Sequence, residues 1–489
     1  MLPLSIFSVN LLSENMLLLA SVLVFSAVLV ARAGSRLGTP SLLLFLLLGM
    51  LVGPDVLGLH FDDLELAESV SHFAMAVILF TAGLETSFEE TRPVFRQGVM
   101  LSTVGVLLTV LLTGLALSLT GMPVAICFLL AAILSSTDSA SVFSVLREKR
   151  LRLRENLAPM LELESGSNDP IALSLTLILV QTFTSADMAG KSTWYLFGTG
   201  ALLLLLQLGV GLAVGLLVGY GAKWVIGKVQ SPNFALTAIL VLSIGFFSNG
   251  LASLLAGNGL LATYLTAIII GNKVRLANQK DITKFFDGIT WMMQLMMFML
   301  LGLMAHPSQM PKMILPALLL CLFMAFVVRP ASVFLCTLPF KKLSFRAKTF
   351  VSWVGLKGAG PILFALCAVV HEVDYASEIF NFVFLFSLFS LMLQGSSLRW
   401  MAKKLRLSYE EDPMVETFGM EVPEEMGMMR DHIVTEEDLS RGATLRDMHL
   451  PHGIRVMMVR RGERFLVPHG SMVLEAGDRL IIIVGESDD

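Results

Sequence analysis

The sequence predicts a polytopic, all-α membrane protein that carries a small soluble α+β domain at its C-terminal end. Of its 489 residues, 55% are apolar and only 15% are charged, against roughly 45–50% and about 25% in soluble domains. Residues 1–408 carry 27 Lys and Arg and 21 Asp and Glu, a net charge of +6, whereas residues 409–489 carry 8 and 18, a net charge of −10. This division predicts a membrane domain over 1–405 and a soluble domain over 406–489. It argues against an ordinary soluble enzyme and against nucleic acid as a partner.

The membrane domain is predicted to span the bilayer thirteen times. A spanning helix needs about 20 mostly apolar residues, and thirteen windows approach that pattern. They are 15–33, 38–53, 70–88, 97–120, 122–146, 157–183, 195–222, 234–253, 258–272, 284–305, 311–330, 348–370 and 377–400. The first window lacks a basic leading segment and a clear cleavage site, so we interpret it as a helix rather than a signal peptide.

The charges of the connecting segments set the predicted orientation. Segments that follow odd-numbered helices contain 23 Lys and Arg, whereas those after even-numbered helices contain only Lys191 and Lys312. Because cytoplasmic loops collect basic residues, the N-terminus is expected outside and the acidic tail in the cytoplasm. We therefore expect a multi-pass protein of the bacterial inner membrane.

An odd number of helices permits two inverted six-helix repeats joined by the seventh helix, which is a transporter plan. In that plan the fifth and twelfth helices correspond, and the sequence interrupts both. The fifth contains Ser-Ser-Thr-Asp-Ser at 135–139, and the twelfth contains Gly-Leu-Lys-Gly-Ala-Gly-Pro at 355–361. Because ion sites in such folds lie at broken helices, we expect the functional site here.

The soluble tail is predicted to be α+β, with strands near 454–460, 464–467 and 479–484 separated by turns. About 80 residues make only a modest core, so we expect it to be shared in a dimer.

Ionisable residues inside hydrocarbon are costly and therefore functional candidates. Asp169 lies about 12 residues into the sixth helix, close to the bilayer midplane, and Ser165 precedes it by one helical turn on the same face. A carboxylate withdrawn from water can hold either a proton or a hard monovalent cation. If only the neutralised forms cross, each cycle exchanges a cation for a proton. Thr137 and Asp138 in the broken fifth helix would add oxygen ligands.

These residues carry a resemblance to a known family. The Thr137-Asp138 break, the motif Glu164-Ser165-x-x-Asn168-Asp169 and the break at 355–358 resemble the NhaP-type branch of the monovalent cation/proton antiporters, sodium/proton-exchanger-like proteins, over residues 10–405. The resemblance implies a NhaA-like fold of thirteen helices and a homodimer. It also implies coordination of the transported cation by Asp169, Asp138, Thr137 and Ser165.

Further positions extend the resemblance. Glu85 resembles an additional carboxylate of that site, and Asn168 before Asp169 resembles electroneutral members, which implies one proton per cation. Glu164 and Lys357 resemble a structural ion pair between the sixth and twelfth helices. Here the chain departs from the family pattern, because Lys357 replaces the usual Arg and cannot form a bidentate pair.

The tail resembles an RCK_C (TrkA-C) regulatory domain from Gly442 to Gly485. Domains of this type dimerise and bind small ligands, often nucleotides, although no Gly-x-Gly-x-x-Gly fingerprint precedes this one. Among NhaP-like proteins, fusion to such a domain resembles the potassium/proton subgroup.

The sequence therefore predicts a transporter and not an enzyme: a potassium/proton antiporter, with sodium or lithium as the alternative cation. No cofactor is expected beyond the transported ions, apart from a small regulatory ligand on the tail, and membrane lipids are expected partners. A ligand-gated potassium channel would need a Thr-Val-Gly-Tyr-Gly filter, which the sequence lacks. An intramembrane aspartyl protease could pair Asp138 with Asp169, but residues 166–169 read Gly-Ser-Asn-Asp instead of Gly-x-Gly-Asp.

Overall fold

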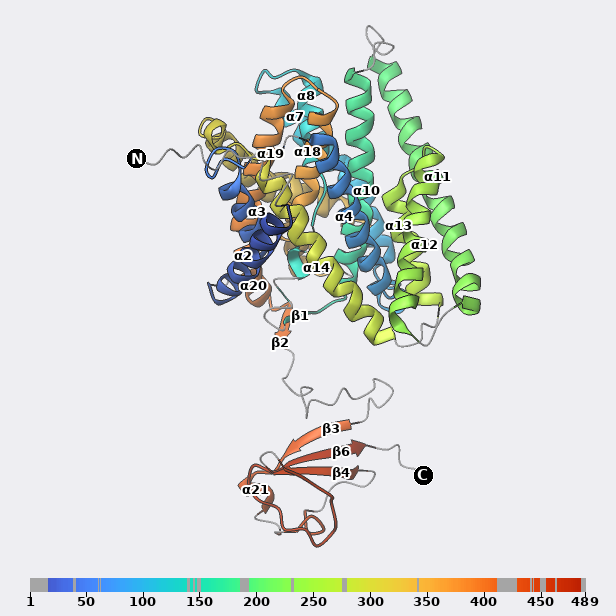
Figure 1. Cartoon of the computed structure of the whole chain (residues 1–489), viewed down its shortest axis with the longest axis vertical. Coiled ribbons are helices and arrows are strands. Elements are labelled where there is room, and N and C mark those ends of the chain that lie inside the picture. Colours follow the sequence, from blue (N-terminus) through green and yellow to red (C-terminus); the bar gives the residue numbers. More distant parts are fainter. Residues whose placement is uncertain are drawn as a thin grey trace. The chain divides into compact units, whose positions relative to one another are not determined.

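A computed structural model describes the chain as two compact units, Met1–Tyr409 and Glu410–Asp489, here called the membrane unit and the tail unit (Figure 1). The described residues are 16–37, 41–59, 61, 63–138, 141–143, 146, 151–184, 193–229, 233–274, 279–340, 343–410, 429–439, 442, 444–448, 454–461 and 464–484.

The membrane unit is built from helices, as predicted. Its first half contains α2 (Met16–Leu37), α3 (Ser41–Val52), α4 (Leu64–Glu85), α5 (Phe88–Thr91), α6 (Phe95–Met100) continued by η2 (Leu101–Gly105) and α7 (Val106–Ser118), α8 (Val124–Ile133) and α10 (Leu157–Thr184). Its second half contains α11 (Thr193–Val229), α12 (Phe234–Leu254), α13 (Gly259–Lys273), α14 (Gln279–Leu303), α15 (Ile314–Phe323) continued by η5 (Met324–Val328) and α16 (Arg329–Thr337), α17 (Phe345–Trp353), α18 (Ala359–Val370), and α19 (Ala376–Ser390) continued by η6 (Leu391–Gly395) and α20 (Ser396–Lys404).

Within the described residues, each of the thirteen apolar windows coincides with a helix, with helices that continue one another or, for 348–370, with α17 and α18 on either side of a break. Among the residues that the structure describes, seven helices are long and apolar enough to span a bilayer, and four more are apolar but shorter. Two of the short helices, α8 and α18, are short because a break interrupts them. The predicted all-helical polytopic fold is confirmed.

Both predicted breaks are present. After α8 ends at Ile133, residues 134–138 are not helical, and residues 354–358 separate α17 from α18. The second break is shorter than predicted, because α18 begins at Ala359 and contains Gly360 and Pro361 in its first turn. Proline is tolerated there, since the first N–H groups of a helix have no partner within the helix.

The packing of α10 against α13 depends on a glycine. A Cβ atom at Gly166 would overlap the ring of Tyr264, which is fully buried. Only glycine therefore allows the two helices to approach this closely, three residues before Asp169.

The tail unit contains one four-stranded antiparallel sheet in the order β3-β6-β4-β5. Its strands are β3 (Met429–Ile433), β4 (Ile454–Arg461), β5 (Arg464–Leu466) and β6 (Arg479–Val484). One face buries Val434, Val459, Leu474, Leu480 and Ile482, and α21 (Glu436–Leu439) follows β3. The three predicted strands are present, and β3 is an edge strand that was not predicted.

A second, two-stranded sheet pairs β1 (Leu151–Leu153) with β2 (Ser408–Glu410). The N–H of Arg154 also donates a 2.8 Å hydrogen bond to the carbonyl of Leu407. Through Leu407, Ser408 and Tyr409 the membrane unit thus holds the segment that follows α20 against the loop that precedes α10.

Candidate functional site

The two broken helices meet in the membrane unit. The N–H of Asp138, in the break after α8, donates a 2.8 Å hydrogen bond to the carbonyl of Leu356, in the break before α18. A Cβ atom at Gly358 would overlap the Asp138 carboxylate. Because Gly358 has no side chain, the two non-helical segments can lie in direct contact.

Lys357 neutralises the end of α8. Its Nζ donates hydrogen bonds to the carbonyls of Ser135 at 3.1 Å and Ser136 at 2.6 Å. These carbonyls lie just after the C-terminal end of α8, where the helix dipole favours a positive charge. The N–H of Lys357 donates to Ser390 Oγ at 2.9 Å, so the break is held from α19 as well.

Asp169 is a buried carboxylate beside a small cavity. Only 7% of the residue is exposed, and the hydroxyl of Ser136 donates a hydrogen bond to its Oδ1. The cavity has a volume of about 40 Å³ and is lined by residues of α3, α4, α10, α14 and α18 together with Ser136 and Asp138. A site needs roughly 10–15 Å³ of such volume to admit a water molecule, so this one has room for a small ion or a few waters.

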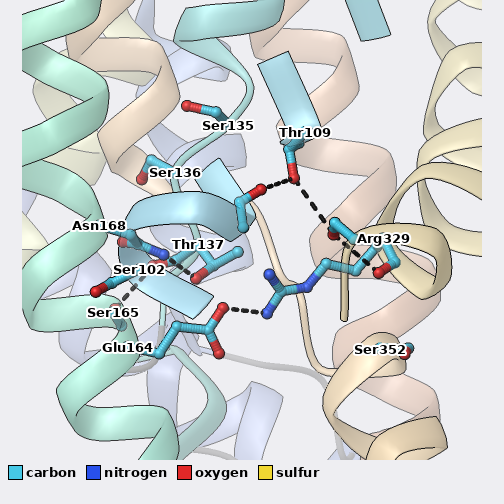
Figure 2. Close-up of polar contacts among 12 residues, drawn as sticks. Ser102, Thr109, Ser135, Ser136, Thr137, Glu164, Ser165, Asn168, Arg329 and Ser352 are labelled. Atoms are coloured by element: carbon cyan, nitrogen blue, oxygen red, sulfur yellow. Dashed lines mark hydrogen bonds and ion pairs between the residues drawn. The ribbon is translucent and has the colours of Figure 1, made fainter. Parts of the chain in front are cut away.

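Residues of α10 hold the break after α8 in place. Ser165 Oγ donates to the carbonyl of Thr137 at 2.7 Å, and the amide of Asn168 donates to the hydroxyl of Thr137. Figure 2 shows these contacts from α10 to Thr137. The predicted site residues Thr137, Ser165 and Asn168 are therefore brought together, with Ser165 and Asn168 each donating a hydrogen bond to Thr137.

The carboxylate of Asp138 has a different environment from that of Asp169. It accepts hydrogen bonds from the N–H of Ser141 at 3.1 Å and from Ser141 Oγ at 2.5 Å. An Asp that accepts from the N–H three residues later is the usual cap at the start of a helix. Asp138 also lines the cavity, so it lies in the site while its carboxylate oxygens accept from Ser141.

The predicted ion pair between Glu164 and Lys357 is wrong. Glu164 pairs with Arg329, the first residue of α16, and both side chains are buried (Figure 2). The ammonium of Lys357 instead binds the two serine carbonyls. The guanidinium is the group that pairs with Glu164, which agrees with the preference for Arg in buried ion pairs.

Two residues of this group, Arg329 and Ser136, were not predicted from the sequence. Arg329 falls near the end of the predicted window 311–330, whereas helix continues to Thr337. The apolar residues that follow Arg329, up to Leu338, are the signal that would have placed it inside the membrane. Ser136 lies in the predicted break, but nothing in the sequence distinguishes its contact with Asp169 from the role of Ser135.

Glu85 is the predicted residue that lies apart from this group. It is the last residue of α4 and is exposed, and it is not among the residues that line the cavity. Ala82, about one helical turn earlier, does line it.

Two family models match the chain. The model for the sodium/hydrogen exchanger, transmembrane region, matches residues 21–404, and that for the TrkA-C domain matches residues 429–488.

Named antiporters are similar to the chain over most of its length. The chain is 35% identical to the K(+)/H(+) antiporter NhaP2 of Shewanella sp. (strain MR-4), over 96% of this chain and 81% of the relative. It is 33% identical to the K(+)/H(+) antiporter NhaP of Alkalimonas amylolytica, with the same coverage. It is 27% identical to the low-affinity Na(+)/H(+) antiporter NhaS1 of Synechocystis sp., over 77% of this chain and 72% of the relative.

A solved structure has the same fold. The sodium proton antiporter MjNhaP1 from Methanocaldococcus jannaschii superposes with a TM-score of 0.67 at 23% identity, covering 79% of this chain and 97% of that one.

Proposed function

The chain belongs to the sodium/hydrogen exchanger family, and from this premise we propose that it is a cation/proton antiporter that exchanges potassium for protons. The observation that carries the proposal is the position of Asp169. It is a buried carboxylate beside a small cavity, next to two broken helices that are in contact with each other.

Asp169 is the group that protons and cations share in this proposal. A buried carboxylate without a compensating charge is strongly disfavoured, so Asp169 crosses the membrane only with a proton or a cation bound. Competition for one carboxylate couples the two fluxes without a leak. Alternating access, by an elevator-type or rocking movement of α8, α10 and α18, exposes this carboxylate to one side at a time.

Thr137, Asp138 and Ser165 complete the proposed cation site. Ser165 and Thr137 lie within one hydrogen-bonded group beside Asp169, and Asp138 and Ser165 line the same cavity. Glu85 lies about one turn from cavity-lining Ala82, and in this proposal it faces ions on their way to the site.

We further propose that the exchange is electroneutral. The residue before Asp169 is Asn168, an amide that donates to Thr137, and the Asp138 carboxylate already accepts two hydrogen bonds from Ser141. One carboxylate is thus left to exchange its proton, which gives one proton per cation.

Potassium is proposed ahead of sodium or lithium because relatives named potassium/proton antiporters match at 33–35% identity over 96% of the chain, whereas the named sodium/proton antiporter NhaS1 matches at 27% over 77%. A tail with a TrkA-C match accompanies this similarity.

We propose that the protein is a homodimer of the bacterial inner membrane, with its N-terminus outside. The tail, from about residue 406 onward, is cytoplasmic and adjusts the transport rate when a small ligand binds.

Transport by the full chain in liposomes tests this function. The vesicles contain a pH-sensitive dye and an imposed pH gradient, and receive potassium, sodium or lithium in turn. We expect potassium to collapse the gradient at a rate that clamping the voltage with valinomycin leaves unchanged. Asp169→Asn should be silent, whereas Asp287→Asn, which alters an exposed carboxylate of α14, should behave as wild type. A proton flux that does not change when any of the three cations is added, or an active Asp169→Asn variant, would refute antiport.

A further inference from the structure

A large hollow lies away from Asp169. It is an open cleft of about 1070 Å³ between the segment that runs from α5 into α6 and the residues that follow α16. We call it the arginine cleft, because Arg92 and Arg96 line it together with Phe88, Phe95 and Phe340.

The lining of the arginine cleft combines positive charge with aromatic surface. Arg92 and Arg96 are both exposed, and 53% of Phe95 is exposed. No carboxylate is among the lining residues that the structure describes. The cleft therefore suits an anion that also carries apolar groups.

The position of the arginine cleft places it at a membrane boundary. One wall connects α4 to α6, and the other follows the last residues of α16, so both walls lie where spanning helices end. Both connecting segments belong to the basic set that follows odd-numbered helices. Leu338 and Phe345, on either side of Phe340 in the sequence, are 67% and 74% exposed. Aromatic and basic residues together are typical of the level of lipid headgroups.

We propose that the arginine cleft binds the headgroup of an anionic phospholipid. The two guanidinium groups bind the phosphate, since their planar donors match phosphate oxygens, and the phenylalanines contact the start of the acyl chains. Basic pockets between spanning helices bind acidic headgroups in this way.

A lipid in this cleft contacts helices that support the transport site. α6 packs on α10, and a Cβ atom at Gly98 of α6 would overlap Leu163, the neighbour of Glu164. The other wall follows α16, which carries the partner of Glu164, Arg329. The bound headgroup thus joins the ends of two helices that both contact α10.

Native mass spectrometry of the purified full-length protein tests the proposal. The protein is titrated with phosphatidylglycerol and, separately, with phosphatidylcholine. We expect wild type to retain phosphatidylglycerol preferentially, and Arg92→Gln/Arg96→Gln to bind it about tenfold more weakly. Lys223→Gln, which removes an exposed cation of α11 outside the cleft, is the matched control and should bind as wild type.

Two further arms separate the alternatives. Glycerol phosphate at millimolar concentration should fail to displace the lipid, since it lacks acyl chains. The melting temperature of each variant should equal that of wild type, because both arginines are exposed. Equal retention of both lipids by wild type, unchanged binding by the double variant, or displacement by glycerol phosphate would each overturn the proposal. Lipid binding is measured without transport, so its failure is distinct from failure of the antiport function.

Discussion

The N–H of Asp138 and the carbonyl of Leu356 are joined by a 2.8 Å hydrogen bond between two segments that are 218 positions apart in the chain. Each segment interrupts a helix, so each exposes backbone groups that a continuous helix would satisfy internally. Pairing one with the other satisfies part of this demand inside the protein. The two breaks therefore support each other and are expected to move together.

Gly358→Ala should abolish transport, because the added Cβ would overlap the carboxylate of Asp138 and force the two breaks apart. Gly250→Ala, on α12, is the matched control, since a Cβ there has no neighbour within 4 Å. The measurement is potassium-driven proton flux in liposomes at equal protein content. Full activity of Gly358→Ala would show that the contact is not needed during the cycle.

Ser136→Ala should raise the KM for potassium by about tenfold, because the ionised Asp169 carboxylate loses a donor worth roughly 1.5–3 kcal/mol. Ser135→Ala is its neighbour control. The Ser135 hydroxyl donates to the carbonyl of Ala132, so its loss should leave the KM unchanged. Identical kinetics of the two variants would contradict the assignment of Ser136.

Lys357→Met should reduce transport by at least tenfold, since the carbonyls of Ser135 and Ser136 lose both their donor and the neighbouring positive charge. Lys357→Arg should retain most of the activity, because a guanidinium can donate to two carbonyls at once. Transport rates at saturating potassium, with the melting temperature as a check on folding, make the comparison. Wild-type rates in Lys357→Met would rule out this role.

Glu164→Gln and Arg329→Gln should each destabilise the membrane unit by about 3–5 kcal/mol, because each leaves the opposite charge buried and unpaired. The double variant should be more stable than the sum of the two effects predicts. Unfolding of the single and double variants in detergent gives the coupling energy. A coupling energy near zero would mean that Glu164 and Arg329 contribute to stability independently, without an interaction between their charges.

The tail unit contains an ion pair that makes its stability depend on pH. Burial by itself raises the pKa of Asp478, but hydrogen bonds from Arg461 and from the N–H of Glu475 prevail and lower it below its ordinary value of 3.8. Because the folded-state pKa is the lower one, the stabilisation is complete above pH 3.8 and is lost as the pH falls through the folded value.

Asp478→Asn should therefore lower the free energy of unfolding of the tail unit by about 2 kcal/mol at pH 7, and the variant's stability should no longer fall in acid through this group. Hydrogen exchange of the β4 and β6 amides in the full chain measures this stability. Glu475→Gln is the control, because the Glu475 side chain is 64% exposed and its bond to Arg461 is accessible to water. An equal loss of stability in Asp478→Asn and Glu475→Gln would show that the buried carboxylate of Asp478 matters no more than the exposed one of Glu475.

Most of the membrane fold could be predicted, because its signals are local. Apolar length identifies each spanning helix, and the polar run at 135–139 and the glycines at 355 and 358 mark the breaks. The partners across helices could not be predicted this way. Whether Glu164 contacts Arg329 or Lys357 depends on the rotation of α10 and α16 about their axes, which apolar length does not determine. In the tail, β3 was missed because Met-Arg-Asp-His-Ile has no apolar alternation and is identified as a strand only by its pairing with β6.

The small sheet of β1 and β2 provides a second path for mechanical force between the exiting chain and the membrane unit. The chain leaves the membrane unit through β2, which is hydrogen-bonded to a strand that ends four residues before α10 begins. A force applied to the polypeptide beyond Tyr409 is therefore transmitted sideways to the start of α10, in addition to along the backbone of α20. Because β1 ends close to the start of the helix that carries Asp169, a pull on the exiting chain reaches that helix by this short route as well as through α20.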